Sequence, residues 1–156
     1  MLALVAPGQG SQTPGMLTPW ISDSDSRQLL ATWSEAIDLD LIHLGTQADA
    51  DEIRDTANAQ PLIVAAGLLS ARALGVDNDA AFMAGHSVGE ITAAAIAGVF
   101  SESDALRLVR TRGVEMAKAA IGSESGMSAV LGGVREDVLQ AIADAGLVAV
   151  NDNGGG

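Results

Sequence analysis

The residues best suited to chemistry form the segment Gly85-His86-Ser87-Val88-Gly89, in which two glycines flank a serine. An apolar run precedes this segment and an alanine-rich run follows it. A serine nucleophile needs this order, because a strand delivers it to a tight turn and a helix then leads the chain away. Side chains at the two glycine positions would crowd such a turn. The pattern therefore predicts a nucleophilic Ser87, and a serine that only caps the following helix is the alternative.

An acyl group on Ser87 would need donors for its oxyanion, and two backbone N–H groups are expected to supply them. The first belongs to Val88, the residue after the nucleophile. The second belongs to Gln9, in a glycine-flanked loop after the first predicted strand, because loops at the carboxyl ends of parallel strands converge. An ordinary glycine turn is the alternative for Gln9. His86 adjoins Ser87, but neighbouring side chains on a tight turn diverge, so we expect it to line the site rather than act as a base.

A cation is predicted at the edge of the apolar stripe on a later helix. Arg112 lies three residues after Val109 and four before Met116 on that helix. A guanidinium desolvated there must find an anion, so it could clamp a substrate carboxylate. Snorkelling to solvent or an internal ion pair is the alternative. His43 lies in an apolar stretch and is expected to be structural, so the chain offers no convincing general base.

Composition limits the classes of function. The chain has 156 residues, of which 48% are hydrophobic and 18% charged, as expected for a folded protein with one core. Its net charge of −12 argues against nucleic acids and anionic membranes as partners. No apolar run approaches the roughly 20 residues of a membrane helix, and the short apolar N-terminus is expected to be a strand rather than a signal peptide, which makes the cytoplasm the default compartment. The absence of cysteine excludes disulfides, thiolate metal sites and cysteine nucleophiles.

Strands and helices alternate along the chain, which predicts an α/β fold with a largely parallel sheet. Pro61 is predicted to be the first residue of its helix and Gly75 to end it. A flexible connector at 122–126 is expected to separate a first module from a β-α-β unit. The expected strands are 2–6, 80–85, 127–131 and 147–150. The expected helices are 27–37, two short helices within 38–58, 61–74, 91–99, 101–120 and 136–145.

Several segments, in their order and spacing, resemble the malonyl-CoA:acyl carrier protein transacylases, and in particular their actinobacterial form. The resemblance implies an α/β-hydrolase-like large subdomain, begun by residues 1–121, and a ferredoxin-like small subdomain, whose first β-α-β unit is 126–156. The segments that carry it are Pro7-Gly8-Gln9-Gly10-Ser11-Gln12, residues 48–56, Gln60-Pro61, Gly85-His86-Ser87-Val88-Gly89-Glu90, Thr111-Arg112-Gly113 with Met116, and Gly126-Met127-Ser128-Ala129.

The same resemblance implies a function. Ser87 would take malonyl from coenzyme A and pass it to the phosphopantetheine thiol of acyl carrier protein, for fatty-acid or polyketide synthesis. Gln9 and Val88 would give the oxyanion N–H groups, and Arg112, His86 and Met116 would bind the substrate, with Arg112 on the malonyl carboxylate. No metal and no cofactor beyond the coenzyme A thioester is implied, and the full-length enzyme is expected to be a monomer.

The resemblance also implies that the catalytic histidine comes later than this chain extends. Two alternatives therefore stay open, a serine ester or thioester hydrolase and an inactive fragment without its general base. We expect residues 1–156 alone to be loosely packed or prone to aggregate, and inactive, because unpaired strands would leave apolar edges exposed.

Overall fold

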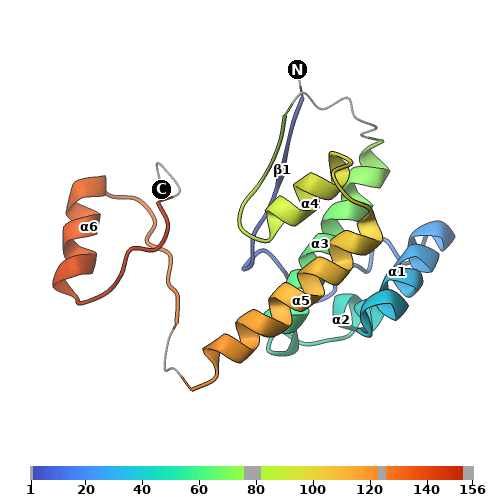
Figure 1. Cartoon of the computed structure of the whole chain (residues 1–156), viewed down its shortest axis with the longest axis horizontal. Helices are drawn as coiled ribbons and strands as arrows, with labels where there is room; N and C mark the ends of the chain where they lie inside the picture. The colour runs from blue at the N-terminus through green and yellow to red at the C-terminus, as the bar shows by residue number, and fades with distance from the viewer. Residues whose placement is uncertain (1, 76–81, 123–125, 153–156) are drawn as a thin grey trace. The chain divides into compact units, whose positions relative to one another are not determined.

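The computed structural model describes residues 2–75, 82–122 and 126–152. The chain divides into two compact units, Met1–Ile121 and Gly122–Gly156. The second unit contains α6 (Arg135–Asp144). The elements of the first unit are β1 (Ala3–Ala6), α1 (Ser24–Ile37), α2 (Leu41–Thr46), the 3-10 helix η1 (Glu52–Arg54), α3 (Thr56–Leu74), β2 (Phe82–Gly85), α4 (Gly89–Ile96) and α5 (Glu102–Ala120) (Figure 1).

A parallel pair of strands confirms the predicted α/β class. β1 lies beside β2 with Ala3 opposite Phe82 and Ala6 opposite Gly85. Residues 80–81 of the predicted second strand lie outside the described residues. Because the two strands are parallel, the loop after Ala6 and the turn after Gly85 leave the same edge of the sheet. This edge is where the sequence placed its candidate nucleophile and oxyanion donors.

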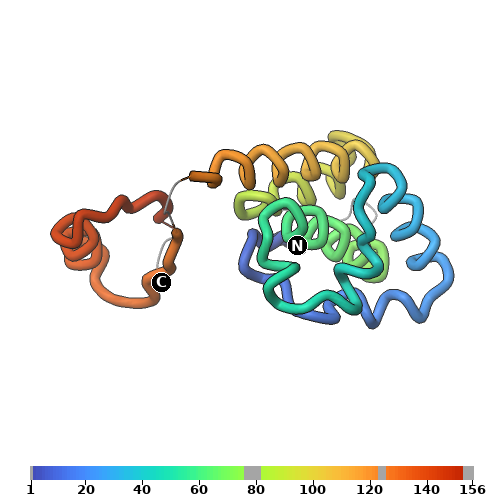
Figure 2. The backbone as a smooth tube through the Cα atoms, turned by 90° about the horizontal axis from the view of Figure 1, so that it is seen from below, coloured from blue at the N-terminus to red at the C-terminus, as the bar shows by residue number. Residues whose placement is uncertain are grey.

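The core of the first unit is a layer of helices centred on α3. This helix makes its most extensive contact with α5 and also packs against α2 and α4. The α5 trace runs alongside the α3 trace in the perpendicular view of Figure 2. Full burial of a leucine contributes about 1.5–3 kcal/mol, so this layer is the main source of stability in the unit. Its fully buried members include Leu30, Trp33, Leu41, Leu62, Leu68, Leu106 and Val109.

Side-chain caps fix where the helices begin. Asp23 caps α1, its carboxylate accepting from the Ser26 N–H over 2.8 Å, so α1 starts earlier than the predicted residue 27. Ser101 caps α5, accepting from the Asp104 N–H over 3.1 Å, and the helix begins within one residue of the predicted start at 101. Each cap satisfies an N–H that has no partner within its helix.

The prediction that Pro61 opens its helix is wrong. Asp55 caps α3 by accepting from the Ala57 N–H over 2.7 Å, which places Pro61 inside the helix, where it is buried. A proline there removes the N–H that would bond to the carbonyl four residues earlier, and that carbonyl belongs to Ala57. Arg110 of α5 donates to the Ala57 oxygen over 3.0 Å instead. A hydrogen bond from a neighbouring helix thus replaces the one that the proline removes. Gly75 ends α3 in the left-handed conformation, as predicted.

Two other predictions need correction. The helix after Ser87 spans Gly89–Ile96 rather than 91–99, because Gly98 turns the chain with a φ of +75°. In the described part of the second unit, residues 127–131 and 147–150 form no strand. Strands persist only when their N–H and C=O groups pair with a neighbour, and here Met127 and Val148 are each 80% exposed. The predicted helix between these two segments is present as α6, one residue earlier at each end.

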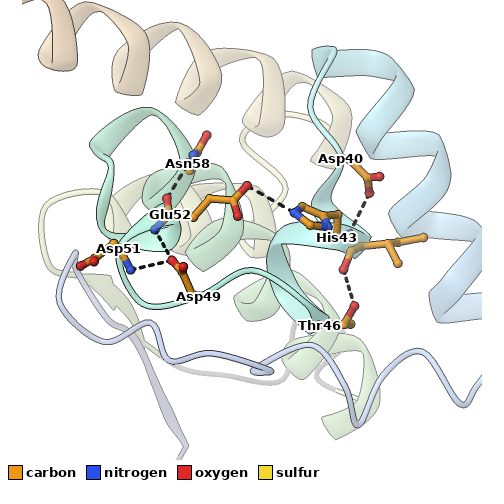
Figure 3. A network of polar contacts seen from close by, with 8 residues as sticks. Asp40, His43, Thr46, Asp49, Asp51, Glu52 and Asn58 are labelled. Carbon is orange, nitrogen blue, oxygen red and sulfur yellow. Dashed lines mark hydrogen bonds and ion pairs between the residues drawn. The ribbon is translucent and has the colours of Figure 1, made fainter.

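His43 lies in a polar network that reaches the start of α3 (Figure 3). Its Nε2 lies 3.3 Å from an Oε1 oxygen of Glu52 in η1. Asn58 of α3 donates to the Glu52 carbonyl over 3.1 Å, and Asp40 accepts from the His43 N–H over 2.8 Å. The network joins α2, η1 and the start of α3, which is the structural role expected for this histidine.

Candidate active site

Ser87 occupies a strained turn between β2 and α4. Its φ is +53°, a left-handed conformation that costs a non-glycine residue roughly 1–2 kcal/mol. A Cβ atom on Gly85 would overlap the backbone of Gly89, and one on Gly89 would overlap the carbonyl oxygen of Ala6. Both glycines are therefore required, as the sequence predicted. Backbone strain of this kind persists where neighbouring contacts hold the residue in place, and strained residues are concentrated at functional sites.

The loop after β1 packs directly against this turn. The His86 N–H donates to the Ala6 carbonyl over 3.0 Å, which extends the pairing of the strands by one bond. A Cβ atom on Gly8 would lie 2.5 Å from His86 Nδ1, so the backbone of the loop lies against the histidine ring. The side chain of Gln9 turns towards α3, where Nε2 donates to Thr56 Oγ1 over 3.1 Å. The loop that carries Gln9 is thus tied to both the turn and the helical layer.

Arg112 meets Ser87 from α5. Its Nη2 atom donates to Ser87 Oγ over 3.1 Å, and its Nη1 atom donates to Gln60 Oε1 over 2.5 Å. In the described residues neither of these partners is a carboxylate, and no carboxylate lies within ion-pair distance of this guanidinium. Within residues 2–75, 82–122 and 126–152, the internal ion pair considered for Arg112 is therefore not formed. A half-buried positive charge faces the serine hydroxyl and is available to an anion.

Gln60 is the site residue to which sequence reasoning assigned no role. It is completely buried in α3, and its Nε2 atom lies 3.2 Å from the sulfur of Met116. Met116 is 45% exposed and lies one turn after Arg112 on α5, so the predicted pair of site residues is joined through Gln60. The available signal was a glutamine within the otherwise apolar stretch Ala59–Ala65, since a fully buried amide requires hydrogen-bond partners.

Gly113 allows α5 to lie close enough for these contacts. A Cβ atom there would be 2.9 Å from the Thr56 carbonyl oxygen and 3.2 Å from the Ala57 Cα. The first turn of α3 therefore packs directly on the α5 backbone beside Arg112. This close approach explains how side chains from α3 and α5 both reach the turn that carries Ser87.

The general base has no candidate with the required geometry among the described residues. Ser87 Oγ hydrogen-bonds to Arg112, and neither His43 nor His86 bonds to it. Within the same ranges, no group of three or more histidine, aspartate and glutamate side chains could hold a metal ion. None of the helices seen there combines the length and apolar character needed to cross a bilayer.

Comparison of the sequence with known proteins identifies the family of this chain. The model of the acyl transferase domain matches residues 3–154. The malonyl CoA-acyl carrier protein transacylase of Mycobacterium tuberculosis is 53% identical over 160 residues, which cover 100% of this chain and 53% of that protein. The protein of the same name from Salmonella typhimurium is 38% identical over 133 residues, or 83% of this chain and 43% of the relative. The chain spans about half the length of the curated relatives it matches.

Solved structures give the same relationship. The crystal structure of MCAT from Mycobacterium tuberculosis superposes with a TM-score of 0.89 at 54% identity, covering 98% of this chain and 52% of the other. A structure of a type II PKS acyl-carrier protein in complex with its malonyl-transacylase matches with a TM-score of 0.78 at 33% identity, over 92% of this chain and 47% of that one.

Proposed function

The chain belongs to the acyl transferase domain family, and on that premise we propose that it carries the nucleophile and the acyl-selecting arginine of a malonyl-CoA:acyl carrier protein transacylase. One observation carries the proposal. The guanidinium of Arg112, which has no carboxylate partner in the described residues, lies 3.1 Å from the hydroxyl of the strained Ser87. This places a positive charge beside an exposed nucleophile, where an acyl group with its own carboxylate would be held.

In the proposed reaction Ser87 Oγ attacks the thioester carbonyl of malonyl-CoA. The Oγ–C bond forms, the C–S bond breaks, and coenzyme A leaves as the thiol with the proton that the serine hydroxyl gives up through a general base. In the second half, the phosphopantetheine thiol of acyl carrier protein attacks the serine ester and regenerates the hydroxyl. The backbone N–H groups of Gln9 and Val88 stabilise the oxyanion in both halves.

Arg112 selects the acyl group by charge. A guanidinium binds a carboxylate through two parallel N–H···O bonds, which are stronger than neutral hydrogen bonds. The net charge of −12 repels an anionic donor at long range, so one positioned cation decides whether the malonyl group stays. His86 and Met116 line the space around it. The reaction as proposed uses no metal and no cofactor besides the coenzyme A thioester.

The finer architecture belongs to the same proposal. Residues 1–121 would contribute to an α/β-hydrolase-like subdomain and residues 126–156 would begin a ferredoxin-like one. The TM-score of 0.89 with a family structure supports this assignment. We further propose that the full-length enzyme acts as a monomer.

Mass spectrometry of the full-length enzyme, rather than of residues 1–156 alone, after incubation with malonyl-CoA tests the proposal. We expect one malonyl group per chain, located on Ser87, and its discharge when holo acyl carrier protein is added. Ser87→Ala should carry no label. Label on another residue would overturn the role of Ser87, and release of free malonate without transfer to the carrier thiol would identify a hydrolase instead.

A further inference from the structure

We infer that Gln60 is a positioning residue for Arg112, and that this buried amide sets the preference for a carboxylated acyl group. The inference rests on the proposed function, because it assigns the residue that aims the acyl-selecting arginine. Gln60 is reached by the Arg112 Nη1 atom over 2.5 Å while the Nη2 atom reaches Ser87 Oγ over 3.1 Å. The guanidinium is thus held at both of its terminal nitrogens, one by α3 and one by the nucleophile.

The chemistry of the two side chains fixes which end of the amide faces the arginine. A guanidinium has only donors, whereas an amide has one acceptor oxygen and one donor nitrogen. The oxygen of Gln60 must therefore face Arg112. Its nitrogen then faces Met116, whose sulfur lies 3.2 Å away and is a weak acceptor. Gln60 is completely buried, so both ends of its amide face protein groups rather than bulk solvent.

A buried neutral anchor suits a residue that must hold a cation without neutralising it. A carboxylate at this position would pair with Arg112 and cancel the charge that the substrate needs. The amide oxygen instead accepts one hydrogen bond and leaves the full positive charge facing Ser87. Since an arginine side chain loses rotamer entropy when it is fixed, anchoring it beforehand removes that cost from substrate binding.

Arg110 provides an internal comparison on the same helix. It lies two residues before Arg112 and also donates to α3, but its acceptor is the Ala57 carbonyl that Pro61 leaves without an intrahelical donor. This contact is to backbone and does not involve the Gln60 side chain. Replacement of Gln60 should therefore release Arg112 and leave Arg110 in place.

The test uses Gln60→Met, which keeps length and volume but removes the acceptor, and Gln60→Glu, which keeps an acceptor but adds a charge. Side-chain ¹⁵N NMR of the arginine-labelled full-length enzyme should show restrained Nη signals for Arg112 in the wild type. We expect these signals to average in Gln60→Met, while those of Arg110 stay unchanged. In parallel, kcat/KM is measured for malonyl and acetyl transfer. Thr92→Val, which removes a hydroxyl that is buried without a partner among the described residues, is the control for loss of a buried polar group.

For Gln60→Met we expect malonyl kcat/KM to fall about 10- to 100-fold, as small misplacements of positioning groups do, while acetyl transfer changes little. Gln60→Glu should keep the Arg112 signals restrained but lose malonyl preference, because the charge is neutralised. Equal losses for both acyl donors, or Arg112 signals unchanged in Gln60→Met, would overturn the inference. Absence of malonyl transfer in the wild type would count against the proposed function alone, since the NMR comparison still decides whether Gln60 positions Arg112.

Discussion

The Arg112 guanidinium touches the oxygen of Ser87 that would carry the acyl group, although the two residues are 25 positions apart in the sequence. An acyl group on Ser87 Oγ would extend from the point that Nη2 already contacts. A carboxylate close to the ester carbonyl, as in malonyl, would remain within reach of the same guanidinium. The position of the Arg112 side chain therefore bears on the length of the acyl group that the site accepts, as well as on its charge.

Removal of this cation should change selectivity more than overall activity. We expect Arg112→Ala to lower kcat/KM for malonyl transfer by about 10- to 150-fold, which corresponds to the roughly 1.5–3 kcal/mol of a hydrogen bond to a charged group. Acetyl transfer should be retained or improved. Rates with the two coenzyme A thioesters measure the ratio, and Arg110→Ala, the loss of the same charge two residues away, should leave it unchanged. Parallel loss for both donors would contradict the clamp.

The strain at Ser87 predicts a difference between two inactive variants. Ser87→Ala and Ser87→Gly both remove the hydroxyl and its bond to Arg112, but only glycine accepts a φ of +53° at no cost. We expect Ser87→Gly to be more stable than Ser87→Ala by about 1 kcal/mol. Denaturant unfolding of the two proteins gives this difference directly. Equal stability would mean that the turn is not strained in solution.

The close packing of α5 on α3 predicts that Gly113→Ala is destabilising. The new methyl group would lie 2.9 Å from the Thr56 carbonyl oxygen, which belongs to the helix backbone and cannot move aside. We expect a loss of about 1–3 kcal/mol, typical of overpacking, together with weaker malonyl transfer as Arg112 shifts. Gly126→Ala is the matched control, because a Cβ atom there meets nothing within 4 Å. A similar loss in both variants would argue against the packing explanation.

The cap of α1 predicts a pH-dependent contribution to stability. Hydrogen bonds from the side chain and the backbone N–H of Ser26 lower the pKa of Asp23 below its ordinary value of 3.8. Because the folded pKa is the lower one, the contribution is present above the unfolded pKa and is lost as the pH falls through the folded value. The difference in Tm between wild type and Asp23→Ala should thus be constant above about pH 5 and shrink in more acidic solution.

Asp23→Asn is the control for this cap. Asparagine caps a helix about as well as aspartate but carries no charge to titrate. We expect its Tm to follow the wild type near neutral pH and to lack the acid-dependent change attributed to Asp23. A wild-type protein whose cap contribution persisted unchanged at pH 2 would contradict the lowered pKa.

Sequence patterns predicted correctly those elements that depend on contacts between residues close together in the chain. Ser101 marked the start of α5, and the spacing around Val109 put Arg112 at the edge of the buried stripe. Pro61 was misplaced because a proline favours a first turn, and the sequence does not reveal that Arg110 from another helix replaces the lost donor. The strands predicted at 127–131 and 147–150 failed for a related reason, since strands need partners that a short segment does not contain.

Site residues were predictable where the sequence carries a local signature, either a motif, as at Ser87, or helical spacing, as at Arg112. The glycines around Ser87 imply a turn, because few other residues fit it. Gln60 carries no such signature. An isolated glutamine in an apolar helix shows that a partner must exist, but only the crossing of α3 and α5 identifies that partner as Arg112.

The pairing of β1 with β2 also determines when the site can form during folding. β1 is synthesised before α1, α2 and α3, whereas its partner β2 follows them. Closing so long a loop costs chain entropy that only the finished pairing repays, and contacts of high sequence separation form slowly. We therefore expect the helices to assemble first on the ribosome and the edge that brings Gln9 and Ser87 together to form late. Until then the nascent chain carries an unpaired apolar strand, which makes early chaperone contact advantageous.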